Sequence, residues 1–140
     1  MTGWLRFVRF NAVGALGIVV QLTLVWLLVD VSALPHLPAT LAAVTAAIVH
    51  NFVWHCAWTW RDRGLAGRAS LAAFWRFALA NGVVSLAGNA AIMSLLVGGA
   101  GLPAVPSNLV AIVACGLVNF WIGDRLVFVV LSPRAVPSSD

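Results

Sequence analysis

Arginine side chains recur at matching places in this sequence, and arginine is well suited to holding a phosphate group. Arg9 and Arg76 each precede a phenylalanine at the start of a long apolar run, while Arg61 and Arg125 lie at the ends of such runs. The planar guanidinium presents a fork of donors that matches two phosphate oxygens at once. These four arginines are therefore candidates for a lipid-phosphate site. The alternative is that they only orient the chain and attract anionic headgroups.

Uncharged amides form a second group of candidates, because they lie within apolar runs, where polar side chains are rare and often functional. Asn81 and Asn89 are separated by two helical steps of four residues, so they would share one face of a helix. Such amides could form a polar track for a lipid headgroup, or they could hydrogen-bond between tightly packed helices. The amides concerned are Gln21, Asn51, Asn81, Asn89 and Asn119.

The chain contains two similar halves that position these side chains. Residues 34–52 read LPHLPATLAAVTAAIVHNF, and residues 102–120 read LPAVPSNLVAIVACGLVNF. A shift of 68 positions superposes Pro35 on Pro103 and Asn51 on Asn119. Matched proline and asparagine positions are not a consequence of apolar composition alone. Repeated halves are common in membrane transporters.

The composition indicates a membrane protein. Of 140 residues, 62% are apolar and 9% are charged, whereas soluble domains carry about 25% charged residues. A span needs about 20 mostly apolar residues, and without water in the bilayer core each span must be helical. The basic residues flank apolar runs and form no soluble basic patch, so we expect no nucleic-acid partner. The four predicted spans are about Phe10 to Val29, Pro38 to Trp58, Phe74 to Val97 and Val105 to Leu126.

The positions of the arginines predict the orientation. All eight positive charges lie near the termini, or between or at the edges of the second and third spans, and the two remaining loops contain none. The positive-inside rule then places both termini in the cytoplasm. We therefore predict an all-α membrane protein of four transmembrane helices, built as two helical hairpins that are parallel repeats. One domain would span 1–140, with repeats at about 5–63 and 71–130 and a disordered tail at 131–140.

Several functions are disfavoured by what the spans lack. No acidic residue or arginine lies in the middle of a span, so a proton-coupled multidrug exporter is a weak reading. His50 and His55 could titrate near the inner end of the second span, or anchor the helix at the interface. The sequence contains no nucleophile–base set, metal-ligand cluster or phosphate-binding glycine loop, so we expect neither an enzyme nor a bound metal or cofactor.

The sequence resembles the GtrA-like family of small four-helix membrane proteins. Each half opens with Arg-Phe followed by glycine and closes with Asn-Phe before a polar, aromatic end, NFVWHCAWTWRDR in the first half and NFWIGDRLVF in the second. The resemblance covers about Leu5 to Val129. It implies a role in cell-surface polysaccharide synthesis, in which a monosaccharide linked to polyprenyl phosphate is moved between leaflets. It also implies a multi-pass protein of the bacterial inner membrane.

The leading hypothesis is a flippase for a lipid-linked sugar. The four arginines would receive the phosphate, the amides would hydrogen-bond the sugar hydroxyls, and Trp58 and Trp60 would stack on the sugar face. Membrane lipids and the polyprenyl-phosphate-linked sugar are the expected partners. Four helices enclose little volume, so a homo-oligomer is expected, with stripes of small residues as its contact faces. The alternative is a non-transporting scaffold that anchors a polyprenyl-phosphate glycosyltransferase.

Overall fold

The computed structural model describes residues 3–65 and 67–129, and every regular element in these ranges is helical. Four helices are long and apolar enough to cross a membrane, which confirms the predicted fold class: Gly3–Val31, His36–Thr59, Gly67–Gly99 and Ala104–Val127. They are longer than the predicted spans mainly because the first and third helices begin seven residues earlier than predicted, at Gly3 and Gly67. The predicted disordered tail lies outside the described residues. The elements are α1 (Gly3–Trp26), η1 (Leu27–Val31), α2 (His36–Trp54), η2 (His55–Thr59), η3 (Arg61–Arg63), α3 (Gly67–Val83), η4 (Val84–Gly88), α4 (Asn89–Met93), η5 (Ser94–Gly99), α5 (Ala104–Ile122) and η6 (Gly123–Val127).

The two hairpins have the same turn. In the first, the Leu34 amide donates to the Leu28 carbonyl at 2.9 Å, and in the second the Leu102 amide donates to Leu96 at the same distance. The residue before each of these leucines is left-handed, with φ of 53° at Ala33 and 67° at Gly101. A left-handed residue is a common way to end a helix. These positions all differ by 68, so the repeat seen in the sequence is also a repeat of geometry.

Small side chains hold each hairpin together. Ala39, Ala43 and Ala47 are buried along α2, and their counterparts Ser107, Ala111 and Cys115 are buried along α5. Small residues at a spacing of four let two helices approach closely. The first set faces a seam with α1, and Cys115 lies against Gly88 of the preceding helix. The prediction that these stripes are dimer faces is therefore corrected, because the packing inside each hairpin already covers them.

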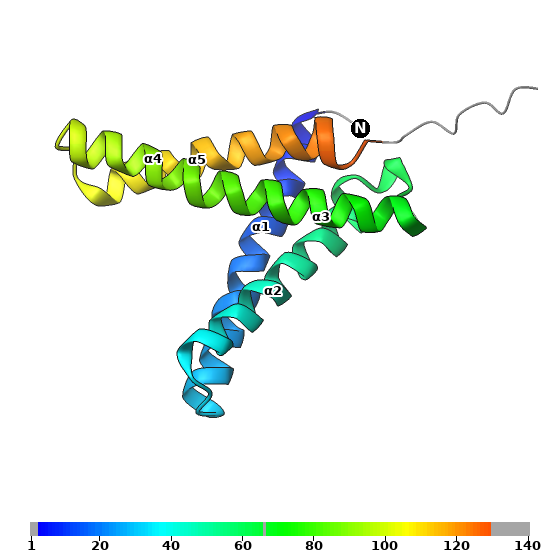
Figure 1. The fold of residues 1–140 in the computed structure, drawn as a ribbon. Coiled ribbons are helices and arrows are strands. Elements are labelled where there is room, and N and C mark those ends of the chain that lie inside the picture. Colours follow the sequence, from blue (N-terminus) through cyan, green and yellow to red (C-terminus); the bar gives the residue numbers. More distant parts are fainter. Residues whose placement is uncertain (1–2, 66, 130–140) are drawn as a thin grey trace, which may run out of the picture.

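The two hairpins meet only at one end. Figure 1 shows one arm formed by α1 and α2 and a second arm formed by α3, α4 and α5, and the arms diverge from a shared corner. Among the residues that the structure describes, close helix approaches between the arms occur only between α1 and α5 and between α2 and α3. The start of α1, the end of α2, the start of α3 and the end of α5 all reach this corner. The candidate site must be built from these four helix ends.

Candidate functional site

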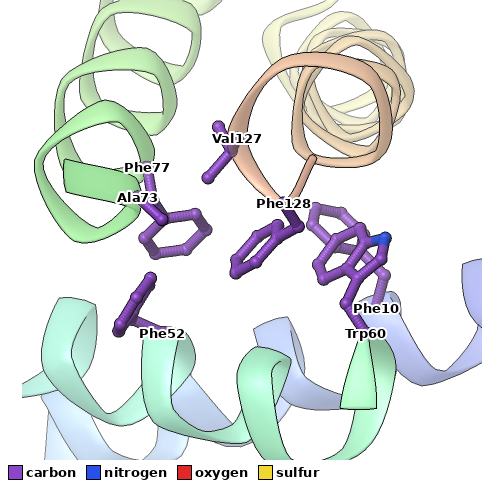
Figure 2. Packing of buried hydrophobic residues seen from close by; sticks show 7 residues of the cluster. All are labelled: Phe10, Phe52, Trp60, Ala73, Phe77, Val127 and Phe128. Atoms are coloured by element: carbon purple, nitrogen blue, oxygen red, sulfur yellow. The ribbon is translucent and has the colours of Figure 1, made fainter. Parts of the chain in front are cut away.

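An aromatic cluster, which we call the junction, joins the two hairpins. Its fully buried members are Trp60, at the end of the first hairpin, and Phe128, at the end of the second, and they are 1% and 0% exposed. Their rings stack with centroids 4.2 Å apart and an interplanar angle of 10°. Figure 2 shows these rings between the helix ends of both hairpins, with Phe10, Phe52, Ala73, Phe77 and Val127 around them. Trp60 and Phe128 differ by 68 positions, so equivalent residues of the two halves meet.

The surrounding rings obey an approximate two-fold relation. Phe52 stacks on Phe128 at 5.8 Å, and its counterpart Phe120 stacks on Trp60 at 6.3 Å. When the halves are exchanged, the Phe10–Trp60 pair, with centroids 5.9 Å apart, corresponds to Phe77–Phe128 at 6.0 Å. In the same way, Phe7–Phe120 at 5.3 Å corresponds to Phe74–Phe52 at 5.2 Å. The junction is therefore a pseudo-symmetric interface between two hairpins. Aromatic pairs at such distances add about 0.5–1.5 kcal/mol each beyond the burial of their area.

Arg9 and Arg76 occupy equivalent positions in this arrangement. Arg9 Nη1 donates to the Trp58 carbonyl at 3.2 Å, and Arg76 Nη1 donates to the Leu126 carbonyl at 3.3 Å. Both acceptors lie in the last turn of the second helix of the same hairpin, where carbonyls have no helical partner. A cation at a helix C-terminus is also favoured by the helix dipole. Each arginine thus ties the first helix of its hairpin to the end of the second.

Asp124 is the centre of an ion network that sequence reasoning missed. Its Oδ1 accepts hydrogen bonds from Arg6 Nη1 at 2.8 Å, Arg63 Nη2 at 2.6 Å and the Trp60 indole Nε1 at 2.9 Å. Arg63 also donates to the Phe128 carbonyl at 2.7 Å, and Arg6 pairs with Asp62 at 2.7 Å. These contacts connect α1, η3 and η6 beside the junction. The guanidinium groups of Arg6 and Arg63 are therefore engaged in contacts that hold the hairpins together.

The ion network breaks the two-fold relation. In the register that pairs Arg9 with Arg76, the counterpart of Arg6 is Ala73, which is fully buried in the junction. The counterpart of Asp124 in the other half is Cys56, which packs against the same apolar cluster. One side of the junction is thus closed by an ion pair, and the equivalent place on the other side by apolar packing.

The remaining predicted arginines are exposed. Arg61 begins η3, and Arg125 lies in η6 with its side chain 70% exposed. Arg125 Nε is 4.0 Å from Asp124 Oδ2, at the limit of an ion pair. The helix ends at this corner carry seven described arginines and only Asp62 and Asp124 as acids, a net charge of +5. This end of the molecule is strongly electropositive.

Two of the predicted amides lie at equivalent contacts within the hairpins. A Cβ added to Gly17 would clash with the side-chain amide of Asn51, so the Asn51 side chain lies directly on the α1 backbone. At the equivalent contact, Asn119 Nδ2 donates to Ser85 Oγ at 3.1 Å. Asn119 Oδ1 is buried and accepts no hydrogen bond from the described residues. A buried acceptor without a partner is costly, so this oxygen favours a donor from outside the described chain.

A small recess between α3 and the end of α5 collects two of the amides. It is lined by Phe77, Ala80, Asn81, Asn119, Ile122, Gly123 and Val127, and its volume is about 10 Å³. A space of this size holds at most one water molecule. The structure therefore brings Asn81 and Asn119 together. Gln21 in α1 and Asn89 in α4 are half-buried, differ by 68 positions and lie on different hairpins.

Of the aromatic and histidine candidates, Trp58 and His50 are half-buried, whereas Trp60 and His55 are buried. Trp58 is half-buried, and the Arg9 guanidinium lies 5.4 Å from the centre of its ring. Trp60 is in the junction with Phe128 against its ring, so the expected sugar-stacking role of Trp60 is corrected: its face is not accessible. His55 is also buried, stacked on Phe10 at 4.9 Å and hydrogen-bonded to Thr59 at 3.1 Å. His50 Nδ1 lies 3.2 Å from Asn51 Oδ1.

The comparison with protein families identifies the fold. The model of the GtrA/DPMS transmembrane domain matches residues 9–128, so the chain belongs to this family, as the resemblance indicated. It is a multi-pass membrane protein of a family linked to polyprenyl-phosphate sugar metabolism. The chain is 39% identical over 57 residues to a dolichol-phosphate mannosyltransferase of Pyrococcus furiosus. That match covers 41% of this chain and 16% of the relative.

Proposed function

We propose that this protein moves the headgroup of a polyprenyl-phosphate-linked monosaccharide across the bacterial inner membrane, for the synthesis or modification of cell-surface polysaccharide. It would act as a transporter and not as an enzyme. The family supports the lipid class, because its members are linked to polyprenyl-phosphate sugar metabolism. The single observation that carries the proposal is the excess of arginines at one end of helices whose apolar spans contain half-buried amides.

The positive corner would attract and orient the phosphate. Arg9, Arg61, Arg76 and Arg125 are the proposed phosphate ligands, since Arg6 and Arg63 are occupied by Asp124. An unpaired phosphate in the bilayer core would be very costly, so it must keep polar partners as it moves. Amides satisfy hydroxyls without adding a charge to the span. The proposed headgroup partners are Gln21, Asn51, Asn81, Asn89 and Asn119, with Trp58 beside them.

A second copy of the chain would complete the path. The recess beside Asn119 has room for about one water, far too little for a monosaccharide. Each hairpin is closed by its own small-residue seam, so the path would run over exposed helix faces. The diverging arms offer such faces, and the polyprenyl tail would stay in the surrounding lipid. We therefore propose that a homo-oligomer encloses the headgroup.

The lipid that copurifies with the protein tests the substrate class. The full chain is extracted gently from its native membrane, and its bound lipids are identified by mass spectrometry. Enrichment of a polyprenyl-phosphate-linked sugar over the bulk phospholipids supports the proposal. A bound pool with the composition of the bulk membrane contradicts it. Native mass spectrometry of the same sample counts the chains in each particle.

The second candidate is a scaffold that anchors or presents lipid to a polyprenyl-phosphate glycosyltransferase. It is favoured by the similarity to part of a protein named as a dolichol-phosphate mannosyltransferase. In this case the exposed arginines would bind lipid or the partner enzyme at the membrane surface without moving a headgroup. Deleting the chain would then displace the glycosyltransferase from the membrane, while the purified protein would leave the distribution of lipid-linked sugar between leaflets unchanged.

A further inference from the structure

The two hairpins carry the same arginine but expose it differently. Arg76 is exposed, and its described hydrogen bonds are to main-chain carbonyls, from Nε to Ala72 and from Nη1 to Leu126, both at 3.3 Å. Arg9 is half-buried, donates to the Trp58 carbonyl and lies over the Trp58 indole. A guanidinium can donate five hydrogen bonds, and Arg76 faces the surroundings with donors that these two carbonyls do not use. The second hairpin thus presents the more available cation.

A second arginine accompanies Arg76. Arg125 immediately precedes Leu126, the residue whose carbonyl accepts from Arg76, so both cations lie at the end of the same hairpin. The charge of Arg125 is poorly compensated, because Asp124 is 4.0 Å away and already accepts from three other donors. Two exposed arginines at the end of one hairpin, with one carboxylate that is shared among several donors, favour the binding of a phosphate. In the first hairpin the counterpart of Arg125 is Ala57, which has no charge.

The recess lies beside this pair of arginines. Phe77 and Val127, which line it, directly follow Arg76 and Leu126 in the sequence. Asn81 of α3 and Asn119 of α5 also line the recess, and Asn119 Oδ1 is the buried acceptor without a described partner. A ligand with a phosphate at the arginines and a sugar hydroxyl beyond it could therefore supply the missing donor.

The equivalent place in the first hairpin is filled. His55 stands where the second hairpin has Gly123; this residue is 2% exposed, and its ring is stacked on Phe10. In the register that pairs Arg9 with Arg76, Gly14 stands where the second hairpin has Asn81. At this place the described residues of the first hairpin therefore include a counterpart of Asn119 but none of Asn81 or of Arg125, and His55 fills the space.

We infer that the chain has a single phosphate-binding site, in the second hairpin, where Arg76 and Arg125 hold the phosphate of a polyprenyl-phosphate-linked sugar and Asn81 and Asn119 bind the sugar hydroxyls nearest to that phosphate. This inference rests on the proposed function, and it reduces the proposed phosphate ligands from four arginines to two, Arg76 and Arg125. Arg9 and Arg61 then serve the structure and the orientation of the first hairpin.

The pseudo-symmetry supplies a matched control for the test. The full chain is titrated with polyprenyl phosphate in detergent, with phosphatidylglycerol as the reference anionic lipid, and binding is followed by native mass spectrometry. We expect one polyprenyl phosphate per chain. Arg76→Gln should weaken its binding about tenfold to a hundredfold, the usual effect of losing charge-assisted hydrogen bonds. Arg9→Gln removes the equivalent carbonyl contact and should change the affinity less than about threefold.

Each outcome decides a separate point. Equal losses in the two variants, or two polyprenyl phosphates per chain, would overturn the single site and leave the proposed function standing. If the wild-type chain prefers polyprenyl phosphate no more than phosphatidylglycerol, the proposed function fails and the inference fails with it. If Arg76→Gln does not fold, the exposed residues Arg125 and Arg61 provide a second test of the single site. Arg125→Gln should weaken the binding of polyprenyl phosphate, and Arg61→Gln should not. Equal effects in that pair would also overturn the inference.

Discussion

Replacing Asp124 with asparagine tests how the two hairpins are held together. The substitution keeps the shape of the side chain and an oxygen to accept from Trp60, but it removes the negative charge between Arg6 and Arg63. The side chains of Arg6 and Arg63 are 14% and 17% exposed. Arg6 Nη1 lies 2.8 Å and Arg63 Nη2 lies 2.6 Å from Asp124 Oδ1. Removing one member of a buried ion pair costs about 3–5 kcal/mol. Asp124 is 22% exposed and Asp62 still faces Arg6, so we expect a smaller loss, about 2–3 kcal/mol.

The assay is the reversible unfolding of the full chain in mixed micelles as the fraction of denaturing detergent is raised. Asp62→Asn is the matched control, because Asp62 contacts Arg6 at 2.7 Å but is 46% exposed. Exposed ion pairs contribute about 0–1 kcal/mol. A double-mutant cycle of Arg6→Gln with Asp124→Asn should give a coupling energy of about 1 kcal/mol or more. The reasoning is refuted if Asp124→Asn destabilises the protein no more than Asp62→Asn does.

Two further predictions concern packing, and the same unfolding titration measures both. Gly17→Ala places a methyl group on the Asn51 side chain and should cost about 1–3 kcal/mol, most of which Asn51→Ala should relieve. Gly14→Ala has no neighbour within 4 Å and should be neutral or slightly stabilising, so equal losses at both glycines would count against the close contact. Trp60→Ala should cost about 3–5 kcal/mol because the ring is buried in the junction. Trp4→Ala, at a side chain that is 74% exposed, should cost less than about 1 kcal/mol, and a larger loss there than at Trp60 would show that the junction is misplaced.

The hairpins could be predicted because their determinants are local. Apolar runs of sufficient length, separated by short loops, leave a helical hairpin as the natural arrangement in lipid. The repeated Leu-Pro at Leu34 and Leu102 also marked two equivalent turns, and both turns make the same hydrogen bond. The left-handed conformation of Ala33 was not evident, because only its counterpart Gly101 is a residue that favours it.

The candidate site was predictable only in part, because arginine is informative about charge but not about its acceptor. The recurrence of Arg9 and Arg76 correctly indicated equivalent positions, yet their partners at Trp58 and Leu126 are main-chain carbonyls, which every residue has. Which arginine is neutralised depends on which helix ends meet. Arg6 and Arg63 are paired with Asp124 across 118 and 61 positions of the sequence, and nothing in their local sequence reveals it.

The junction was missed although the sequence contained its signal. The shift of 68 that superposes Asn51 on Asn119 also superposes Trp60 on Phe128. Aromatic residues near the inner interface usually face the headgroups, and Trp60 was predicted to stack on the face of the sugar. The contact between Trp60 and Phe128 is a contact between halves, and a repeat alone does not say whether equivalent residues meet or lie apart. The divergence of the arms in Figure 1 could not be predicted for the same reason, since a repeat does not show how its two halves are oriented. Only the few residues of the junction set the angle between the hairpins.

Translocation itself is tested most directly in vesicles that contain only the purified chain and a polyprenyl-phosphate-linked monosaccharide with a labelled sugar. An oxidant that cannot cross the membrane is added outside, and it destroys the sugars of the outer leaflet. The account predicts that vesicles with the wild-type protein lose nearly all of the labelled sugar, while protein-free vesicles retain the inner-leaflet half. Retention of that half in the presence of folded wild-type protein, with the vesicles intact, would contradict the account and favour the scaffold.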